Sequence, residues 1–163
     1  MRVRMIVTAV ALAAATGLPT LAGSPAAAAE AARDCVVNLD DKTVTCAATE
    51  AEARRAAAVP AASLTIARLY DLPNYKGASH TFVQSRACTP SYDTEWQWDD
   101  LRNTSGGNWS NRASSVHTYN SCDVRLYDGV DFAGAVSTWI DQSANLAAVG
   151  SGWSNRASSI KFS

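Results

Sequence analysis

Asparagine and serine oxygens recur at fixed spacing in this chain, because the heptapeptide Trp-Ser-Asn-Arg-Ala-Ser-Ser occurs at 109–115 and again at 153–159. Oxygens of this kind ligate hard cations such as calcium, and they also hydrogen-bond to the backbone of turns. A repeated heptapeptide in a chain of 163 residues marks an internal repeat, whose structural unit has to be found first. Each copy runs into a β-branched residue, Val116 or Ile160, so each is expected to be a turn that leads into a strand.

Side chains that could act as catalysts are sparse. Neither His80 nor His117 has a cysteine, a second histidine or an acid at the spacing of a metal site or a catalytic triad. The sequence also lacks a glycine-rich phosphate loop, a zinc motif and a nucleophile elbow. We therefore expect a protein that is not an enzyme and requires no cofactor.

The first residues have the pattern of an export signal. Arg2 and Arg4 precede an apolar run, and the alanines of 26–29 offer Ala-x-Ala cleavage sites, so 1–29 is predicted to be a signal peptide. Its removal leaves 12 of the 14 basic residues against 15 acidic ones, a net charge of −3. The sequence thus predicts a secreted protein, and this weak acidity argues against nucleic acid or a membrane surface as its partner.

Four cysteines follow the signal. In an exported chain an even number favours two disulfides, and the clustering that a metal site requires is absent. Three pairings are possible, of which proximity in the sequence favours Cys35–Cys46 and Cys88–Cys122.

Residues 30–62 are predicted to form an N-terminal appendage. Two β-branched runs within 35–46 indicate a hairpin with the cysteines at its open end. Thr49 and Glu52 form a capping box for a short alanine-rich helix, which Pro60 ends. Two interpretations stay open: a removable pro-segment, or a fixed extension of the core.

From 63 onward the chain changes to short β-rich runs between turn residues, which predicts an all-β sandwich or barrel. The sixteen residues 67–82 align with 124–139 at seven identical positions, so the repeat is larger than the heptapeptide. Each unit, 63–119 and 120–163, has the strand and turn order of a Greek key. Two such units are expected to pair their apolar faces, because one alone cannot bury its own.

The two units resemble those of βγ-crystallins, over about 64–163. Each has an aromatic pair with a glycine two residues after it and a serine late in the motif that would hold the folded hairpin. The matching residues are Tyr70, Tyr75, Gly77 and Ser115 in the first unit, and Tyr127, Phe132, Gly134 and Ser159 in the second. The resemblance implies a double Greek-key sandwich, preceded here by the small disulfide hairpin and short helix.

The repeated heptapeptide is also similar to the calcium-binding pattern of that family. The positions that match as ligands, together with aspartates of the folded hairpins that could add oxygens from the partner motif, are Asn111, Ser114, Asn155, Ser158, Asp71 and Asp128. Serine replaces the expected Asn or Asp at Ser110 and Ser154, which predicts weak calcium binding at most. The alternative is that these side chains only hydrogen-bond the hairpins.

The two units differ most in the loop 86–108, which makes the first unit longer. Long loops on a rigid β scaffold often hold binding residues, and aromatic side chains are common interface anchors. The interface candidates are Tyr92, Trp96, Trp98, Asp99 and Asp100. The alternative is that the two tryptophans cap one end of the core.

Size, export signal and cysteine count resemble those of crystallin-fold metalloproteinase inhibitors, which implies a monomer that binds a secreted proteinase through a loop. The alternative is a calcium-binding structural or envelope-associated domain without a proteinase target.

Overall fold

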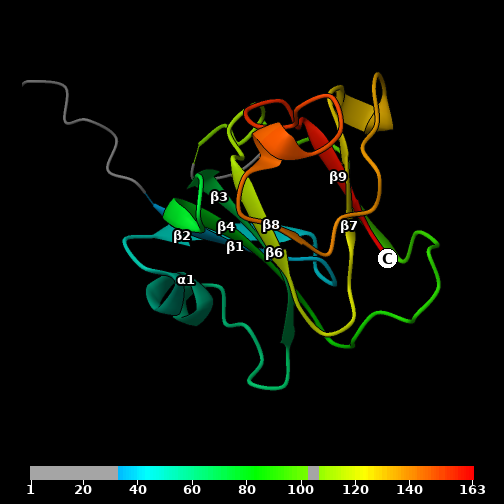
Figure 1. Cartoon of the computed structure of the whole chain (residues 1–163). Helices are drawn as coiled ribbons and strands as arrows, with labels where there is room; N and C mark the ends of the chain where they lie inside the picture. The colour runs from blue at the N-terminus through cyan, green and yellow to red at the C-terminus, as the bar shows by residue number, and fades with distance from the viewer. Residues whose placement is uncertain (1–32, 103–106) are drawn as a thin grey trace, which may run out of the picture.

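The computed structural model describes residues 33–102 and 107–163, so the predicted signal peptide 1–29 lies outside the described residues. The described residues fold into two β-sheets that pack against each other (Figure 1). The larger sheet has the strand order β2-β1-β4-β3-β6-β8, and the smaller one the order β5-β9-β7. The strands are β1 (Asp34–Asn38), β2 (Thr43–Ala47), β3 (Leu64–Leu72), β4 (Lys76–Gln84), β5 (Trp96–Trp98), β6 (Ser115–Thr118), β7 (Val124–Tyr127), β8 (Gln142–Ser143) and β9 (Ser159–Phe162). The helical segments are α1 (Glu50–Ala56) and the 3-10 turns η1 (Val130–Phe132) and η2 (Leu146–Ala148).

Each Greek key gives one strand to the sheet of the other. The first unit supplies β3, β4 and β6 to the larger sheet, but its β5 pairs with β9 of the second unit. The second unit supplies β7 and β9 to the smaller sheet, while its β8 pairs with β6. Residues 136–140 complete the second key through two isolated bridges to β7. The predicted all-β double Greek-key sandwich is confirmed by this exchange, which also ties the two units into one core.

The folded hairpins are built as the sequence pattern predicted. Ser115 Oγ donates a hydrogen bond to the Leu72 carbonyl at 2.7 Å and accepts one from the Tyr75 amide at 3.0 Å. Gly77 has φ +82°, and a Cβ at this position would lie 2.0 Å from Asp71 Oδ1, so glycine is required.

The second hairpin repeats this construction. Ser159 Oγ donates to the Gly129 carbonyl at 2.7 Å and accepts from the Phe132 amide at 3.1 Å. In each hairpin the aromatic pair packs edge to face, with ring centroids 5.8 Å apart in the first and 5.6 Å apart in the second. The two serines at the ends of the heptapeptides are therefore structural.

The tryptophans that open the heptapeptides lie in the core. Trp109 is fully buried and Trp153 is 2% exposed, among apolar side chains from both sheets. A turn follows each tryptophan, and β6 and β9 begin at the last serine of each heptapeptide, which confirms the expectation that each copy is a turn that leads into a strand.

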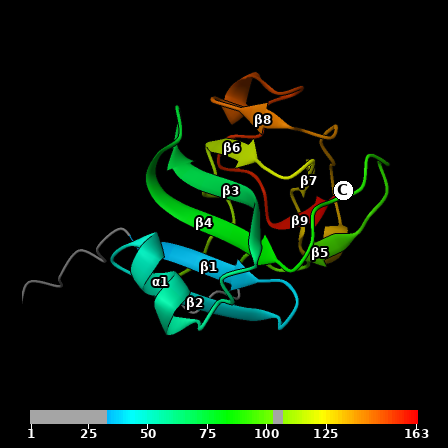
Figure 2. The same ribbon diagram turned by 90° about the horizontal axis from the view of Figure 1, so that it is seen from below.

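The N-terminal hairpin belongs to the same sheet as the first Greek key. Strand β1 pairs with β4 in parallel, and Figure 2 shows β2, β1, β4 and β3 side by side with α1 against the hairpin. Val37 and Leu39 reach the central core, and Ala53 of α1 packs against Val36 and Val83. This arrangement agrees with the fixed extension, while processing of 30–62 and the domain boundaries stay predictions.

Both predicted disulfides are confirmed, Cys35–Cys46 across the N-terminal hairpin and Cys88–Cys122 between the units. Two disulfides are typical of proteins that fold in an oxidising compartment. No helix in the described part of the chain has the length and apolar composition needed to cross a membrane.

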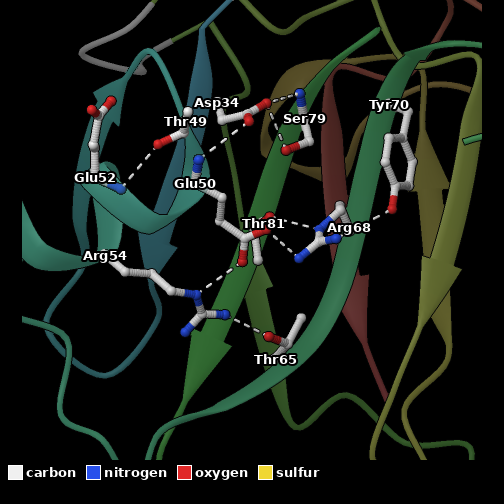
Figure 3. A network of polar contacts seen from close by, with 10 residues as sticks. All are labelled: Asp34, Thr49, Glu50, Glu52, Arg54, Thr65, Arg68, Tyr70, Ser79 and Thr81. Atoms are coloured by element: carbon white, nitrogen blue, oxygen red, sulfur yellow. Dashed lines mark hydrogen bonds and ion pairs between the residues drawn. The ribbon is translucent and has the colours of Figure 1, made fainter. Parts of the chain in front are cut away.

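A polar network joins the N-terminal segment to β3 and β4 (Figure 3). Asp34 accepts hydrogen bonds from the amide and the hydroxyl of Ser79 and, through its other oxygen, from the first amide of α1. Glu50 forms ion pairs with Arg54 in α1 and with Arg68 in β3. Because no disulfide links this segment to the Greek keys, these contacts hold it there together with the β1–β4 pairing and the apolar packing of Val37 and Leu39.

Candidate functional site

The loop that precedes β5 is held at both of its ends. Cys88 is disulfide-bonded to Cys122, and its amide donates to the Asn120 carbonyl at 3.1 Å. At the other end the Glu95 amide donates to the Phe162 carbonyl in β9 at 3.0 Å. Figure 2 shows the loop standing out beside β5. Residues 89–94, which are all exposed, are therefore presented between two fixed points; we call them the 89–94 loop.

The carboxylate of Glu95 links the two ends of this loop. Its Oε1 accepts hydrogen bonds from the Thr89 amide at 2.6 Å and the Thr89 hydroxyl at 2.7 Å, and its Oε2 is 2.7 Å from a guanidinium nitrogen of Arg86. Burial alone would raise the pKa of Glu95, but the Thr89 hydrogen bonds and the Arg86 charge together lower it. The guanidinium of Arg86 also lies 4.0 Å from the centre of the Trp96 ring. Glu95 thus stays ionised and braces the loop at neutral pH.

The five interface candidates lie in different environments. Tyr92 is 71% exposed and stacks loosely on Trp139, with ring centroids 6.2 Å apart. Trp98 is only 8% exposed, and Trp96 packs partly buried against the core, because both belong to β5 and pair with β9. Tyr92 is therefore the aromatic candidate that a partner could reach.

The two acidic candidates lie beyond β5 and outside the 89–94 loop. Asp99 is exposed, and its carbonyl accepts from the Asp131 amide at 2.9 Å. Asp100 forms an ion pair with Arg102, and hydrogen bonds from Arg102 lower the pKa of Asp100.

The two heptapeptides meet each other across the molecule. Ser114 Oγ donates to Asn155 Oδ1 at 3.1 Å and accepts from Ser154 Oγ at 3.1 Å, while Ser110 and Ser158 share a hydrogen bond of 2.7 Å. Each group of neutral oxygens thus combines residues of both copies. Asn111 and Asn155, at the same position of the two copies, have left-handed backbone conformations with φ of 58° and 55°, which asparagine tolerates well.

The two aspartates of the folded hairpins face arginines of their own motifs. Asp71 Oδ2 is 3.0 Å from a guanidinium nitrogen of Arg112, and Asp128 Oδ2 is 3.0 Å from one of Arg156. The hydrogen bond from Arg156 is the main reason that the pKa of Asp128 is lowered.

These arginines, at the fourth position of each heptapeptide, are structural residues that the sequence interpretation missed. Their presence in both copies was the available signal. Each guanidinium also lies over the tryptophan that opens its own heptapeptide, at 4.6 Å in the first copy and 4.8 Å in the second. Each arginine therefore links a folded hairpin to the core.

Within the described residues, no three histidine, cysteine, aspartate or glutamate side chains lie close enough to hold a metal ion. Calcium at the heptapeptides would therefore have fewer than three such side chains among its ligands, and the remaining ligands would be neutral serine and asparagine oxygens. Such ligands give low affinity, because affinity rises with the number of carboxylates. Calcium binding stays a prediction.

No protein-family model and no curated protein matches the chain. Among solved structures, a βγ-crystallin domain from Flavobacterium johnsoniae is 22% identical, with a TM-score of 0.43, over 60% of this chain and 93% of that domain. A double mutant of a βγ-crystallin domain from Clostridium beijerinckii is 19% identical, with a TM-score of 0.45, over 61% of this chain and 97% of that domain. A second mutant of that domain is 16% identical, with a TM-score of 0.41, over 60% of this chain and 95% of the domain.

These likenesses concern the fold. The exchange of strands between the sheets and the two serine-held hairpins define the chain as a βγ-crystallin-like double Greek-key protein. The finer resemblance to proteinase inhibitors stays a prediction.

Proposed function

We propose that this protein is a secreted, non-enzymatic inhibitor that binds a proteinase through the 89–94 loop. The observation that supports this function best is the combination of full exposure and fixed ends in that loop. The disulfide at Cys88 and the hydrogen bonds of Glu95 limit how far the loop can rearrange.

Such a loop loses little freedom when it enters a cleft. Ordering a flexible side chain at an interface costs about 0.5–1.5 kcal/mol, and ordering the backbone costs more, so a loop that is already fixed binds more tightly. Pro90 restricts the backbone further. Tyr92 offers a large ring with few rotatable bonds, a kind of side chain that is enriched among interface anchors.

The direct experiment is an inhibition assay with the secreted chain, residues 30–163, against a panel of secreted metalloproteinases and serine proteinases. We expect inhibition of at least one member at micromolar protein. The inhibitor should remain uncleaved at the 89–94 loop during the assay, as judged by intact mass. Lack of inhibition across the panel, or rapid cleavage of that loop, would contradict the proposal.

A second candidate function is calcium binding at the heptapeptides. It is supported by the three neutral oxygens of Ser114, Ser154 and Asn155, which already lie within hydrogen-bond distance of one another. A ligand that binds only the folded state raises its stability, so the midpoint of thermal unfolding should rise in millimolar calcium relative to chelator. A midpoint that is equal in both conditions would exclude this function.

A further inference from the structure

A cavity of about 440 Å³ opens beside the 89–94 loop. Its walls are residues 118–123, which connect the two Greek keys, together with Asp141 and the exposed Tyr92. Two consecutive residues of the connection, Asn120 and Ser121, have left-handed backbones with φ of 58° and 60°. The Cys88 amide holds the Asn120 carbonyl, and the Asn120 side chain donates to the Thr65 carbonyl at 2.7 Å, so this wall is fixed.

The side chains that line this cavity include two carboxylates and no basic group. The Thr118 hydroxyl shares its proton between the Asp141 carbonyl at 2.5 Å and Asp141 Oδ1 at 2.9 Å, which leaves Oδ2 for another donor. Asp123 is half-buried, and within the described part of the chain neither carboxylate takes part in an ion pair.

No ion pair among the described residues neutralises these two negative charges. Burial, and then the charge of Asp141, raise the pKa of Asp123. A cation in the cavity would offset the repulsion between the two carboxylates, because it attracts the charged form of each and donates charge-assisted hydrogen bonds to them. By contrast, the aspartates of the folded hairpins, Asp71 and Asp128, already have arginine partners.

We propose that this cavity binds the guanidinium or ammonium group of a basic side chain of the partner, next to Tyr92. The cavity is large enough for an arginine side chain, and the Tyr92 ring at its rim could stack on the cation. This inference rests on the proposed function for the identity of the partner, a secreted proteinase that would present an arginine or lysine beside its cleft. The 89–94 loop would then supply the apolar contact, and the cavity the charge specificity.

The test uses small probes, so that it does not depend on a proteinase. Binding of N-acetylarginine amide to the secreted chain is measured by NMR titration, with N-acetylcitrulline amide as the uncharged isostere. We expect the arginine probe to bind at least about tenfold more tightly than the citrulline probe, with shifts at the amides of 118–123. Equal binding of both probes, or no shift at these amides with the arginine probe, would overturn the inference.

Variants locate the charge. The double variant Asp123→Asn/Asp141→Asn is expected to weaken the arginine probe about tenfold and to leave the citrulline probe unchanged. The control Asp40→Asn/Glu52→Gln removes the same charge from two exposed positions of the N-terminal segment and should bind like the unmodified protein. Equal weakening by both double variants would refute a specific site. If the first variant fails to fold, the comparison of the two probes on the unmodified protein still decides the question.

The two proposals can fail separately. Arginine-probe binding without any proteinase inhibition would refute the proposed function but leave the cation site. Inhibition without arginine-probe binding would leave the function and refute the cavity as its specificity element.

Discussion

Mild acid is expected to destabilise the folded protein through His80. This side chain lies in β4, fully buried, with its ring 5.0 Å from that of Trp109 and 5.1 Å from that of Phe82. Neither ring nitrogen has a hydrogen-bond partner among the described residues. Burial, with a further contribution from the charge of Arg112, lowers the pKa of His80 from 6.5 to about 3.

The magnitude follows from proton linkage. Below pH 6.5 the unfolded chain takes up a proton at His80 that the folded chain does not, so the free energy of unfolding falls by about 1.4 kcal/mol per pH unit, down to about pH 3. Between about pH 7.5 and pH 5 the loss from His80 is about 2 kcal/mol.

The other groups with shifted pKa values change the free energy of unfolding little over this pH range. The lowered pKa values of Glu95, Asp100 and Asp128 cost stability mainly below their usual range near pH 4. The raised pKa of Asp123 has the opposite sign, because the folded state then binds its proton more readily, and it offsets part of the loss.

The assay is urea unfolding, followed by tryptophan fluorescence, at several pH values between about 7.5 and 5. His80→Leu, similar in volume but without a titratable group, should lose most of the pH dependence whatever its absolute stability. Ile160→Val, a core change in the other Greek key, should lower stability equally at each pH. The role of His80 is refuted if the free energy of unfolding of the unmodified protein varies by less than about 0.5 kcal/mol over this pH range, or if His80→Leu keeps the full pH dependence.

Three further predictions concern the scaffold. Ser115→Ala should lower the free energy of unfolding in urea by about 2–3 kcal/mol, because it removes two hydrogen bonds of a buried hydroxyl. The control Ser85→Ala, at an exposed position, should leave it nearly unchanged, and equal effects of the two variants would contradict the role of Ser115 in the hairpin. Gly77→Ala should lower the free energy of unfolding by about 2 kcal/mol or more in the same assay, because the new Cβ would collide with Asp71 Oδ1. An unchanged free energy of unfolding would refute this close contact. Glu50→Gln should lower the free energy of unfolding by only about 0.5–1 kcal/mol, but it should speed hydrogen exchange of the β1 amides more than that of the β7 amides. An equal increase in exchange rate in both strands would show that the network does not hold the N-terminal segment.

Local signals in the sequence were sufficient for several features. Thr49 caps α1 by accepting a hydrogen bond from the Glu52 amide at 3.3 Å, as the capping box predicted. The helix ends at Ala56, before the predicted limit, because Ala58 has a left-handed backbone with φ 50°. The folded hairpins were also predictable from their repeated spacing, and the Cys35–Cys46 disulfide from a separation of 11 residues, which left Cys88 and Cys122 as the remaining pair.

Long-range pairings were not predictable. Nothing local specifies that β1 adds in parallel to β4, because parallel partners are chosen by tertiary packing and not by a turn. The same holds for β5, whose pairing with β9 buries Trp98 and leaves Tyr92 as the exposed aromatic candidate. The cavity beside Tyr92 combines residues 118–123 with Asp141, which only the strand exchange between the two keys brings together.

The most direct test of the proposed function is the inhibition constant of the unmodified protein, compared with Tyr92→Ala, against the proteinase of the panel that is inhibited most strongly. Leu72→Ala, which shortens another exposed apolar side chain on the folded hairpin, is the matched control. Binding through the 89–94 loop predicts that Tyr92→Ala weakens inhibition at least about tenfold, since truncation of an interface anchor costs about 2 kcal/mol or more, while Leu72→Ala inhibits normally. Inhibition that is unchanged by Tyr92→Ala, or weakened equally by both variants, would contradict binding through the 89–94 loop.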